Sequence, residues 1–142
     1  EVFLSLGATD AMLKAQCSEY EQLMRKHCVD LSTEIEGISK GSEMPLWRIY
    51  AVNCRTEILN TLKQQQKDTV SVANNECSGI LNLSSCINAQ NWDWLQDMED
   101  NSVLLRMRKR DKTLLMVIEP GMVGKIGLNN YGIGVTLMLL AR

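Results

Sequence analysis

Residues 77–93 read CSGILNLSSCINAQNWD, and they mark the point where the apolar pattern of the chain changes from helical to strand-like. Two apolar runs, 78–83 and 87–92, flank the short turn Ser84-Ser85-Cys86, and this arrangement predicts an antiparallel hairpin. Downstream, two further pairs of apolar runs flank turn-forming residues, namely 103–108 with 113–118 and 123–128 with 133–140. Three successive hairpins predict an antiparallel meander.

The length of the first turn decides which residues face each other across this hairpin. A three-residue turn pairs Leu83 with Ile87 and therefore sets Cys77 directly opposite Asp93, with Cα atoms about 5 Å apart. A two-residue turn shifts the register by one residue, which still leaves Cys77 and Asp93 as cross-strand neighbours. The sequence therefore predicts a thiol and a carboxylate at the open end of one hairpin.

The sequence before residue 70 carries apolar residues at helical spacing and predicts three helices. The first begins at a cap on Thr9 or Asp10, the second ends at a left-handed cap at Gly37 or Gly41, and the third begins at Pro45. Helices followed by an antiparallel sheet predict an α+β fold. The residues expected to face the helical core are Leu13, Cys17, Tyr20, Leu23 or Met24, Cys28 or His27, Leu31, Ile35, Ile38, Leu46, Ile49, Tyr50, Cys54, Ile58 and Leu62.

The composition is that of one globular domain. The chain has 142 residues, of which 45% are hydrophobic and 23% charged, and its formal net charge is −2. These values exclude intrinsic disorder and argue against nucleic acid or an anionic membrane as a partner. Five cysteines at scattered spacing predict free thiols in a reducing, intracellular compartment, either cytoplasmic or peroxisomal. Because the chain begins with Glu1 and stops within an apolar strand-like segment, we expect it to be a piece of a longer protein.

Most short motifs in the sequence lack a residue that their chemistry needs. Gly121–Lys125 hints at a phosphate-binding loop, but Glu119 stands where that motif needs glycine and Ile126 where it needs Ser or Thr. With a single histidine, His27, and no Cys-x-x-Cys pair, the sequence predicts neither a metal site nor a cofactor. The basic run Arg106–Lys112 is interpreted as a solvated hairpin tip.

The pair Cys77 and Asp93 has a chemical interpretation that the other motifs lack. A carboxylate raises the pKa of a neighbouring thiol, so Asp93 does not activate Cys77 directly. A carboxylate does orient a cation, and an α-ammonium appears if the chain is cut before Cys77. An α-amine has a pKa of about 7.7–8.0 and can serve as the base for a thiol of pKa about 8.5. The alternative is that Cys77 is a small buried hydrophobic residue and that Asp93 caps a strand end.

Four sequence blocks occur in the order found in a known enzyme family. They are Asn53-Cys54-Arg55-Thr56-Glu57, Cys77-Ser78, Gln90-Asn91-Trp92-Asp93-Trp94 and EPGMVGKIGLN at 119–129. Together they resemble the isopenicillin-N acyltransferase family of N-terminal-nucleophile hydrolases, over about residues 34–135. This resemblance implies an αββα sandwich and an inactive proenzyme that cuts itself before a cysteine.

The resemblance also implies roles by position. Cys77 would be the nucleophile, Glu76–Cys77 the self-cleaved bond, Asp93 the aspartate beside the nucleophile, and Ser78 a proton shuttle. The residues expected to line the acyl pocket are Trp94 and Leu95, and those expected to support the site are Asn91, Asn53, Arg55, Thr56 and Glu57. Two positions depart from the family pattern, because Glu76 replaces a common glycine and Gly79 replaces a hydroxyl residue.

The predicted organisation is a helical proregion over 1–76 and the start of a catalytic β-chain over 77–142. The predicted function is acyl transfer or amide hydrolysis through a thioester on Cys77. Its substrate would be a small-molecule amide or acyl thioester, and its partner the C-terminal remainder of the same proenzyme. This chain by itself would be inactive, because the family's oxyanion asparagine lies downstream. Two alternatives stay open, a truncated or non-catalytic relative that binds a partner and a thiol hydrolase that uses uncut Cys77 with His27 as base.

Overall fold

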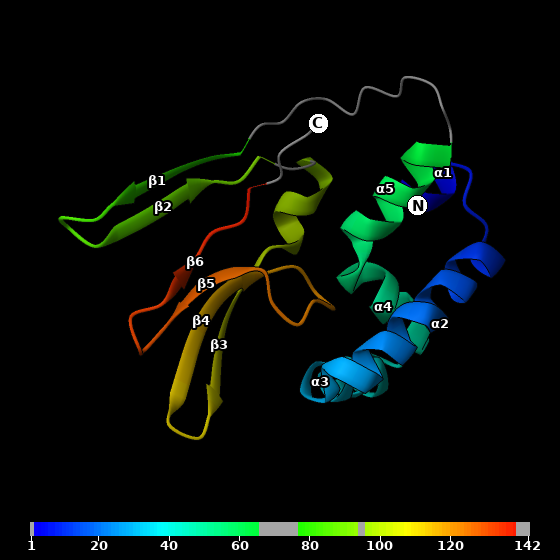
Figure 1. The fold of residues 1–142 in the computed structure, drawn as a ribbon, viewed down its shortest axis with the longest axis horizontal. Helices are drawn as coiled ribbons and strands as arrows, with labels where there is room; N and C mark the ends of the chain where they lie inside the picture. Colours follow the sequence, from blue (N-terminus) through cyan, green and yellow to red (C-terminus); the bar gives the residue numbers. More distant parts are fainter. Residues whose placement is uncertain (1, 66–76, 94–95, 139–142) are drawn as a thin grey trace. The chain divides into compact units, whose positions relative to one another are not determined.

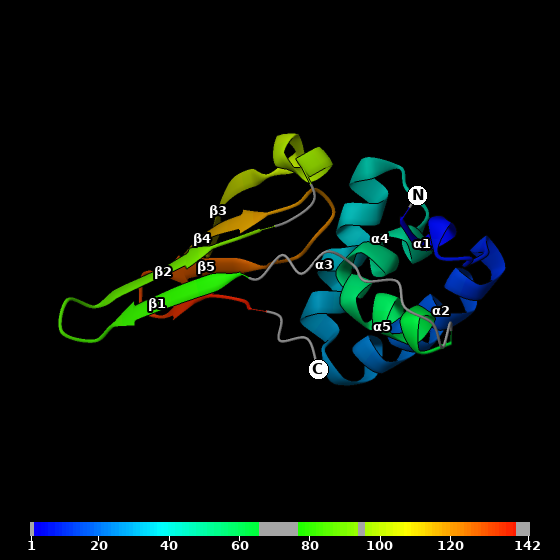
Figure 2. The same ribbon diagram turned by 90° about the horizontal axis from the view of Figure 1, so that it is seen from above.

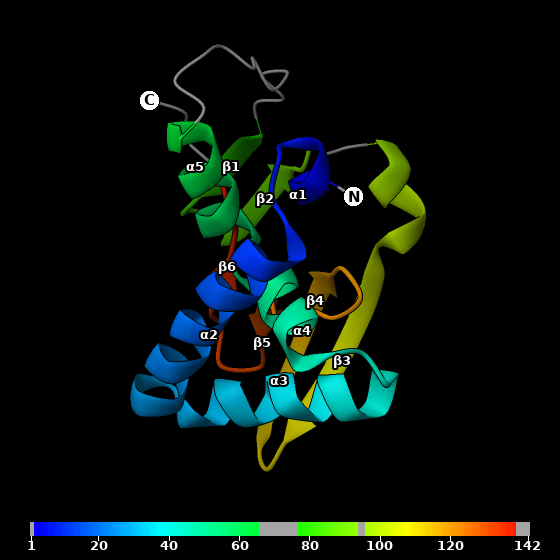
Figure 3. The same ribbon diagram turned by 90° about the vertical axis from the view of Figure 1, so that its right-hand side faces the viewer.

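Five helices precede the strands in the computed structural model, which describes residues 2–65, 77–93 and 96–138. They are α1 (Val2–Ser5), α2 (Asp10–His27), α3 (Val29–Ser42), α4 (Leu46–Asn53) and α5 (Arg55–Gln65). Figure 3 shows α4 packed against both α2 and α3. These helices, together with the segment Gly121–Val123, form one compact unit.

Helix α2 begins as the sequence predicts. Thr9 has an extended backbone, and its side-chain oxygen accepts a hydrogen bond from the backbone N–H of Met12 at 3.3 Å. Thr9 is therefore the cap, and Asp10 lies in the first turn, where its negative charge is favourable at the positive end of the helix dipole.

The predicted end of helix α3 is wrong. Gly37 and Gly41 both lie inside the helix, which ends one residue before Glu43, a residue in the left-handed conformation with φ of 56°. A glycine inside a helix costs about 1 kcal/mol relative to alanine. The burial of Ile35, which is fully shielded from solvent, outweighs this local cost.

A single helix from Pro45 to Leu62 was expected, and the structure divides it into α4 and α5. Pro45 lies at the cap position and not at the predicted first helical position, since α4 begins at Leu46. Helix α4 ends at Asn53, and Cys54 interrupts the helical conformation. The Asn53 side chain donates a hydrogen bond to the backbone carbonyl of Ile49 at 2.9 Å. Asparagine side chains compete with the backbone for such groups, which explains why the helix breaks at this point.

The core of the helical unit agrees largely with the predicted stripe. Its buried hydrophobic residues are Ala8, Leu13, Cys17, Ile35, Ile49, Tyr50, Ala51, Cys54, Ile58 and Leu62, with Tyr20, Met24, Ile38 and Leu46 packed against them. Leu31 is 42% exposed, because Ser32 takes the inward position and lies beside the Tyr50 hydroxyl. Cys28 and His27 are both exposed, so neither extends the stripe of α2.

We expect the Tyr50→Phe substitution to lower the free energy of unfolding by about 1–3 kcal/mol, because it leaves a buried hydroxyl without its partner. The Tyr50 hydroxyl lies 2.9 Å from the Ser32 Oγ, and both residues are buried. Urea unfolding followed by circular dichroism measures the change. Tyr20→Phe is the matched control, because Tyr20 is only half-buried and its hydroxyl accepts from Gln16. Equal losses in both variants would contradict the assignment.

The strand unit contains two antiparallel sheets among the described residues. One pairs β1 (Ser78–Asn82) with β2 (Ile87–Asn91), which Figure 2 shows side by side. The other has the order β3 (Val103–Lys109), β4 (Lys112–Ile118), β5 (Ile126–Asn129) and β6 (Gly134–Val135), coloured yellow to red in Figure 1. A 3-10 helix, Gln96–Asn101, lies between the sheets in the sequence.

All three predicted hairpins are confirmed, but the single meander is wrong. β1 and β2 form a sheet of their own, and the meander comprises β3 to β6. The last strand is also shorter than expected, since β6 covers Gly134–Val135 and not 133–140. The basic run Arg106–Lys112 covers the end of β3, the Arg110-Asp111 turn and the start of β4, and its charged side chains are exposed, as predicted. Mixed helix and antiparallel sheet agree with the α+β expectation, and the αββα sandwich stays a prediction.

Candidate functional site

The sequence allows two registers for the β1–β2 hairpin, and the structure has the one that is shifted by one residue. Asn82 pairs with Ile87 and Ser78 with Asn91, so the loop contains four residues. The Asn82 side-chain oxygen accepts hydrogen bonds from the backbone N–H groups two and three residues later, at 3.0 and 3.2 Å. Cys86 closes the loop in the left-handed conformation, with φ of 53°. These two features stabilise the longer loop.

This register decides between the two geometries expected for the candidate nucleophile. Cys77 and Asp93 do not lie directly opposite each other, because continuing the observed pairing sets Cys77 opposite Trp92. Cys77 and Asp93 still lie at the same end of the hairpin, since Cys77 directly precedes β1 and Asp93 follows β2 by two residues. The thiol and the aspartate are therefore neighbours that do not share a face of the ladder.

Cys77 contacts Asp93 through the backbone. The Cys77 Sγ lies 3.9 Å from the backbone carbonyl oxygen of Asp93, in the geometry of a weak S–H hydrogen bond. The two Asp93 carboxylate oxygens accept from the Asn91 Nδ2 at 3.2 and 3.1 Å. Both Cys77 and Asp93 are half-buried. In this arrangement the Cys77 thiol lies beside Asp93, and the side-chain amide of Asn91 orients the Asp93 carboxylate.

The remaining predicted residues near the nucleophile fall into two groups. Ser78 is the first residue of β1, is exposed, and pairs with Asn91 across the ladder. Glu76, Trp94 and Leu95, which were expected to form the cleavage site and the acyl pocket, lie outside the described residues.

Trp92 belongs to a buried charged cluster that the sequence analysis missed. The Lys125 Nζ lies 3.5 Å from the centre of the Trp92 ring and 2.7 Å from the Glu119 Oε1. The side chains of Lys125 and Glu119 are only 7% and 3% exposed. From the sequence, Lys125 was considered only as part of the incomplete phosphate-binding loop and of the segment 119–129 that resembles the enzyme family. The sequence feature that could have indicated this ion pair is the presence of a glutamate and a lysine on either side of the Pro120-Gly121 turn.

The supporting residues predicted around Asn53 lie in the helical unit. The Asn53 Nδ2 donates to the carbonyl of Gly121 at 2.8 Å, and its Oδ1 accepts from the N–H of Val123 at 2.9 Å. Arg55, Thr56 and Glu57 follow in the first turn of α5. Asn53 therefore fixes the backbone of the segment Gly121–Val123, and support of the site around Cys77 by these residues stays a prediction.

Burial argues against a nucleophilic role for two of the other cysteines. It raises the pKa of the Cys17 thiol to about 11, and that of the Cys54 thiol to about 11, where the nearby Glu57 adds to the effect. These two thiols are therefore protonated at neutral pH. Cys28 and Cys86 are exposed, and all five cysteines are free. Cys77 combines partial exposure with an adjacent carboxylate residue.

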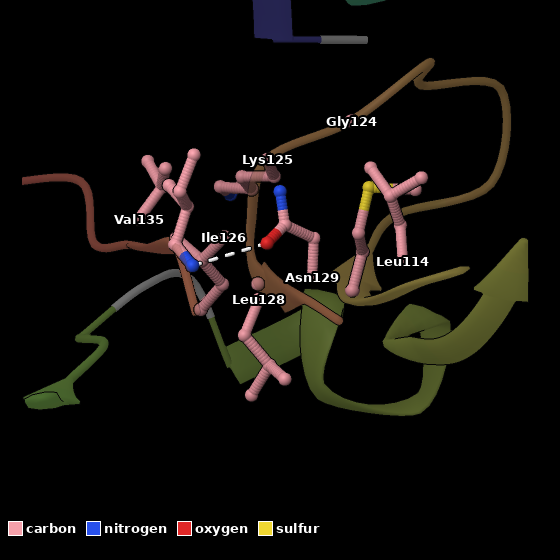
Figure 4. Close-up of a pocket in the computed structure, with 10 residues that line it drawn as sticks. Leu114, Gly124, Lys125, Ile126, Leu128, Asn129 and Val135 are labelled. Carbon is pink, nitrogen blue, oxygen red and sulfur yellow. Dashed lines mark hydrogen bonds between the residues drawn. The ribbon is translucent and has the colours of Figure 1, made fainter. Parts of the chain in front are cut away.

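An open apolar hollow of about 250 Å³ lies on the four-stranded sheet (Figure 4). It is lined by Leu114, Met116, Gly124, Lys125, Ile126, Gly127, Leu128, Asn129, Ile133 and Val135. The Asn129 side-chain oxygen, drawn in Figure 4, accepts from the N–H of Ile133 at 3.0 Å and fixes one side of the hollow. Cys77 and Asp93 are not among the lining residues.

The part of the chain that the structure describes contains no cluster of three or more His, Cys, Asp or Glu side chains able to hold a metal ion. Among the same residues, no helix combines the length and apolarity needed to cross a membrane.

Comparison with known proteins supports a relationship to acyltransferases. No protein-family model matches the chain. The chain is 30% identical over 128 residues to the 40 kDa form of acyl-coenzyme A:6-aminopenicillanic-acid-acyltransferase from Emericella nidulans. The match covers 89% of this chain and 34% of that protein, so the chain spans about a third of the length of the curated relative that it matches. This similarity agrees with the motif resemblance and supports a related family.

Proposed function

We propose that the full-length protein is a self-processing cysteine acyltransferase or amidohydrolase whose nucleophile is Cys77. The observation that carries this proposal is the contact of the Cys77 thiol with Asp93, whose carboxylate is itself held by Asn91. The match to an acyl-coenzyme A-dependent acyltransferase supports the same class of reaction.

The first stage is cleavage of the bond before Cys77. The Cys77 sulfur attacks the carbonyl carbon of Glu76, the bond from that carbon to the Cys77 nitrogen breaks, and the nitrogen takes up a proton. Residue 76 is then linked to the sulfur as a thioester. Water attacks the thioester and releases residues up to 76 with a free carboxylate, which leaves Cys77 with a free thiol and a free α-amine.

The second stage is acyl transfer on the new chain terminus. The Cys77 α-amine accepts the thiol proton, and the resulting thiolate attacks the carbonyl carbon of the substrate. The leaving group departs with a proton, and the acyl group stays on the sulfur until an amine or water removes it. In this scheme Asp93 stabilises the α-ammonium, because a nearby negative charge favours the charged form of an amine.

We propose an acyl thioester or a small amide as the acyl donor. The name of the matched relative gives acyl-coenzyme A as its donor and 6-aminopenicillanic acid as its acceptor. A related donor suits a cysteine nucleophile, because attack of the thiolate on a thioester forms one carbon–sulfur bond and breaks another of the same kind.

Mass spectrometry of the full-length protein tests the proposal. We expect two pieces that divide between residues 76 and 77, with cysteine as the first residue of the second piece. Hydroxylamine should speed the division and leave residue 76 with a hydroxamate in place of the carboxylate, because it attacks the thioester carbonyl instead of water and does not attack a peptide bond. An intact chain that is fully active would overturn the proposal, and a His27→Ala variant would then test the thiol-hydrolase alternative.

A second candidate function, binding of a macromolecular partner without catalysis, is favoured by exposed apolar side chains. Ile80, Leu81 and Leu83 of the first hairpin are 69%, 68% and 81% exposed, and Leu104 of β3 is 67% exposed. Such groups are typical of surfaces that another chain segment covers. An intact and inert full-length protein that forms a stable complex would support this candidate over the enzyme.

A further inference from the structure

The buried ion pair Glu119–Lys125 lies at one end of the strand unit. Glu119 directly follows β4, and Lys125 directly precedes β5. Because Val117 pairs with Ile126, the β4–β5 ladder fixes the starting points of both side chains. The geometry of the pair is therefore set by the rigid sheet and not by a free loop.

Burial of this pair requires compensation. Both side chains are removed from water almost completely, and the loss of hydration is expensive even for a close pair. The Trp92 ring provides a second contact, because the Lys125 ammonium lies 3.5 Å from the ring centre, within the range of a cation–π interaction. Buried charged groups are in some proteins retained to specify one geometry, and here that geometry is the position of the Trp92 ring.

Trp92 connects the ion pair to the open end of the first hairpin. It stands between Asn91, which holds the Asp93 carboxylate, and Asp93, whose carbonyl oxygen accepts from the Cys77 thiol. A ring held in place limits the backbone angles of its own residue and therefore the path by which the chain enters Asp93. The contacts run without a gap from Glu119 through Lys125 and Trp92 to the open end of the hairpin.

We propose that Lys125 is a positioning residue that acts through Trp92 to hold Cys77 against Asp93. The role of Cys77 as nucleophile rests on the proposed function, whereas the effect of Lys125 on its position does not. Lys125 touches neither the thiol nor the scissile bond in this scheme. It sets the place from which the sulfur attacks.

The test removes the cation together with the charge of the carboxylate that it contacts. Lys125→Met alone leaves the Glu119 carboxylate buried without this partner, so the variant of choice is Lys125→Met combined with Glu119→Gln. Lys125→Arg is the conservative control, because a guanidinium can both pair with a carboxylate and stack on an aromatic ring. All variants are made in the full-length protein, and melting temperatures confirm that they fold.

The first readout is the alkylation rate of Cys77 by iodoacetamide, resolved by peptide mass spectrometry. We expect it to change by at least about fivefold in the double variant, because a thiol released from its neighbour differs in exposure and reactivity. Cys86, at the other end of the same hairpin, is the internal control and should change by less than about twofold, since it is already exposed. Lys125→Arg should keep the wild-type rate at both sites. An unchanged Cys77 rate overturns the proposal.

The second readout is a double-mutant cycle with Trp92→Leu. Cleavage before Cys77 should slow by about tenfold to a hundredfold in the Lys125→Met/Glu119→Gln variant, because small misplacements of reacting groups have effects of this size. In a Trp92→Leu background the same double substitution should have no further effect, and fully additive losses would overturn the route through Trp92. If no variant and no wild-type protein is cleaved, the proposed function fails, and the alkylation rates still decide the role of Lys125.

Discussion

Replacement of Cys77 by alanine in the full-length protein should abolish cleavage after residue 76 and lower turnover by about 10⁶-fold, the loss typical of removing a catalytic nucleophile. The side chain supplies the sulfur atom through which the protein itself forms a bond to the acyl carbon in this scheme. Cys77 is half-buried and precedes a strand whose side chains are exposed, so the loss of one sulfur atom should leave the fold intact. Intact-mass measurement and a thioester hydrolysis assay give the two results.

Two other cysteines are matched controls for this substitution. Cys86→Ala removes an exposed thiol from the same hairpin and should leave cleavage and turnover unchanged. Cys54→Ala removes a buried thiol of the helical core, so it should lower the melting temperature while cleavage still occurs. If Cys77→Ala were cleaved at the same bond, or either control were as inactive as Cys77→Ala, the nucleophile would be assigned wrongly.

The sequence predicted local structure better than the contacts between distant segments. Apolar spacing located the three hairpins and most of the helical core, because a period of 3.6 or 2 residues directly reports which face is buried. The break at Cys54 depends on one side-chain bond from Asn53 to Ile49, which leaves no trace in the apolar pattern. The register of the first hairpin depends on the Asn82 side chain, because its hydrogen bonds to the loop backbone stabilise a loop that is one residue longer.

The candidate site was predicted in part for the same reason. Cys77, Asn91 and Asp93 lie close together because a hairpin brings residues with a nearly constant index sum together, and this rule is readable in a sequence. The contact of Trp92 with Lys125 joins the first hairpin to the beginning of β5. No local rule connects positions so far apart, and only the folded chain shows that the lysine and the tryptophan meet.

The substitution Asp93→Asn should lower turnover by about a hundredfold, while the melting temperature changes by no more than about 2 °C. Asparagine has nearly the same shape, and its side-chain oxygen can still accept from the Asn91 Nδ2, as each of the two carboxylate oxygens does now. The backbone carbonyl that the Cys77 thiol contacts is also unaffected. What disappears is the negative charge that stabilises the new α-ammonium.

The measurement separates this role from a structural one. Turnover as a function of pH should show that the basic group governing activity titrates at a lower pH in Asp93→Asn, because loss of a nearby negative charge lowers the pKa of an amine. Asn91→Ala is the matched control, since it releases the carboxylate from its amide partner but keeps the charge, and it should lower turnover less than Asp93→Asn does. A fall in stability that accounts for the whole loss of activity, with no shift of the pH profile, would mean that Asp93 acts only in holding the hairpin.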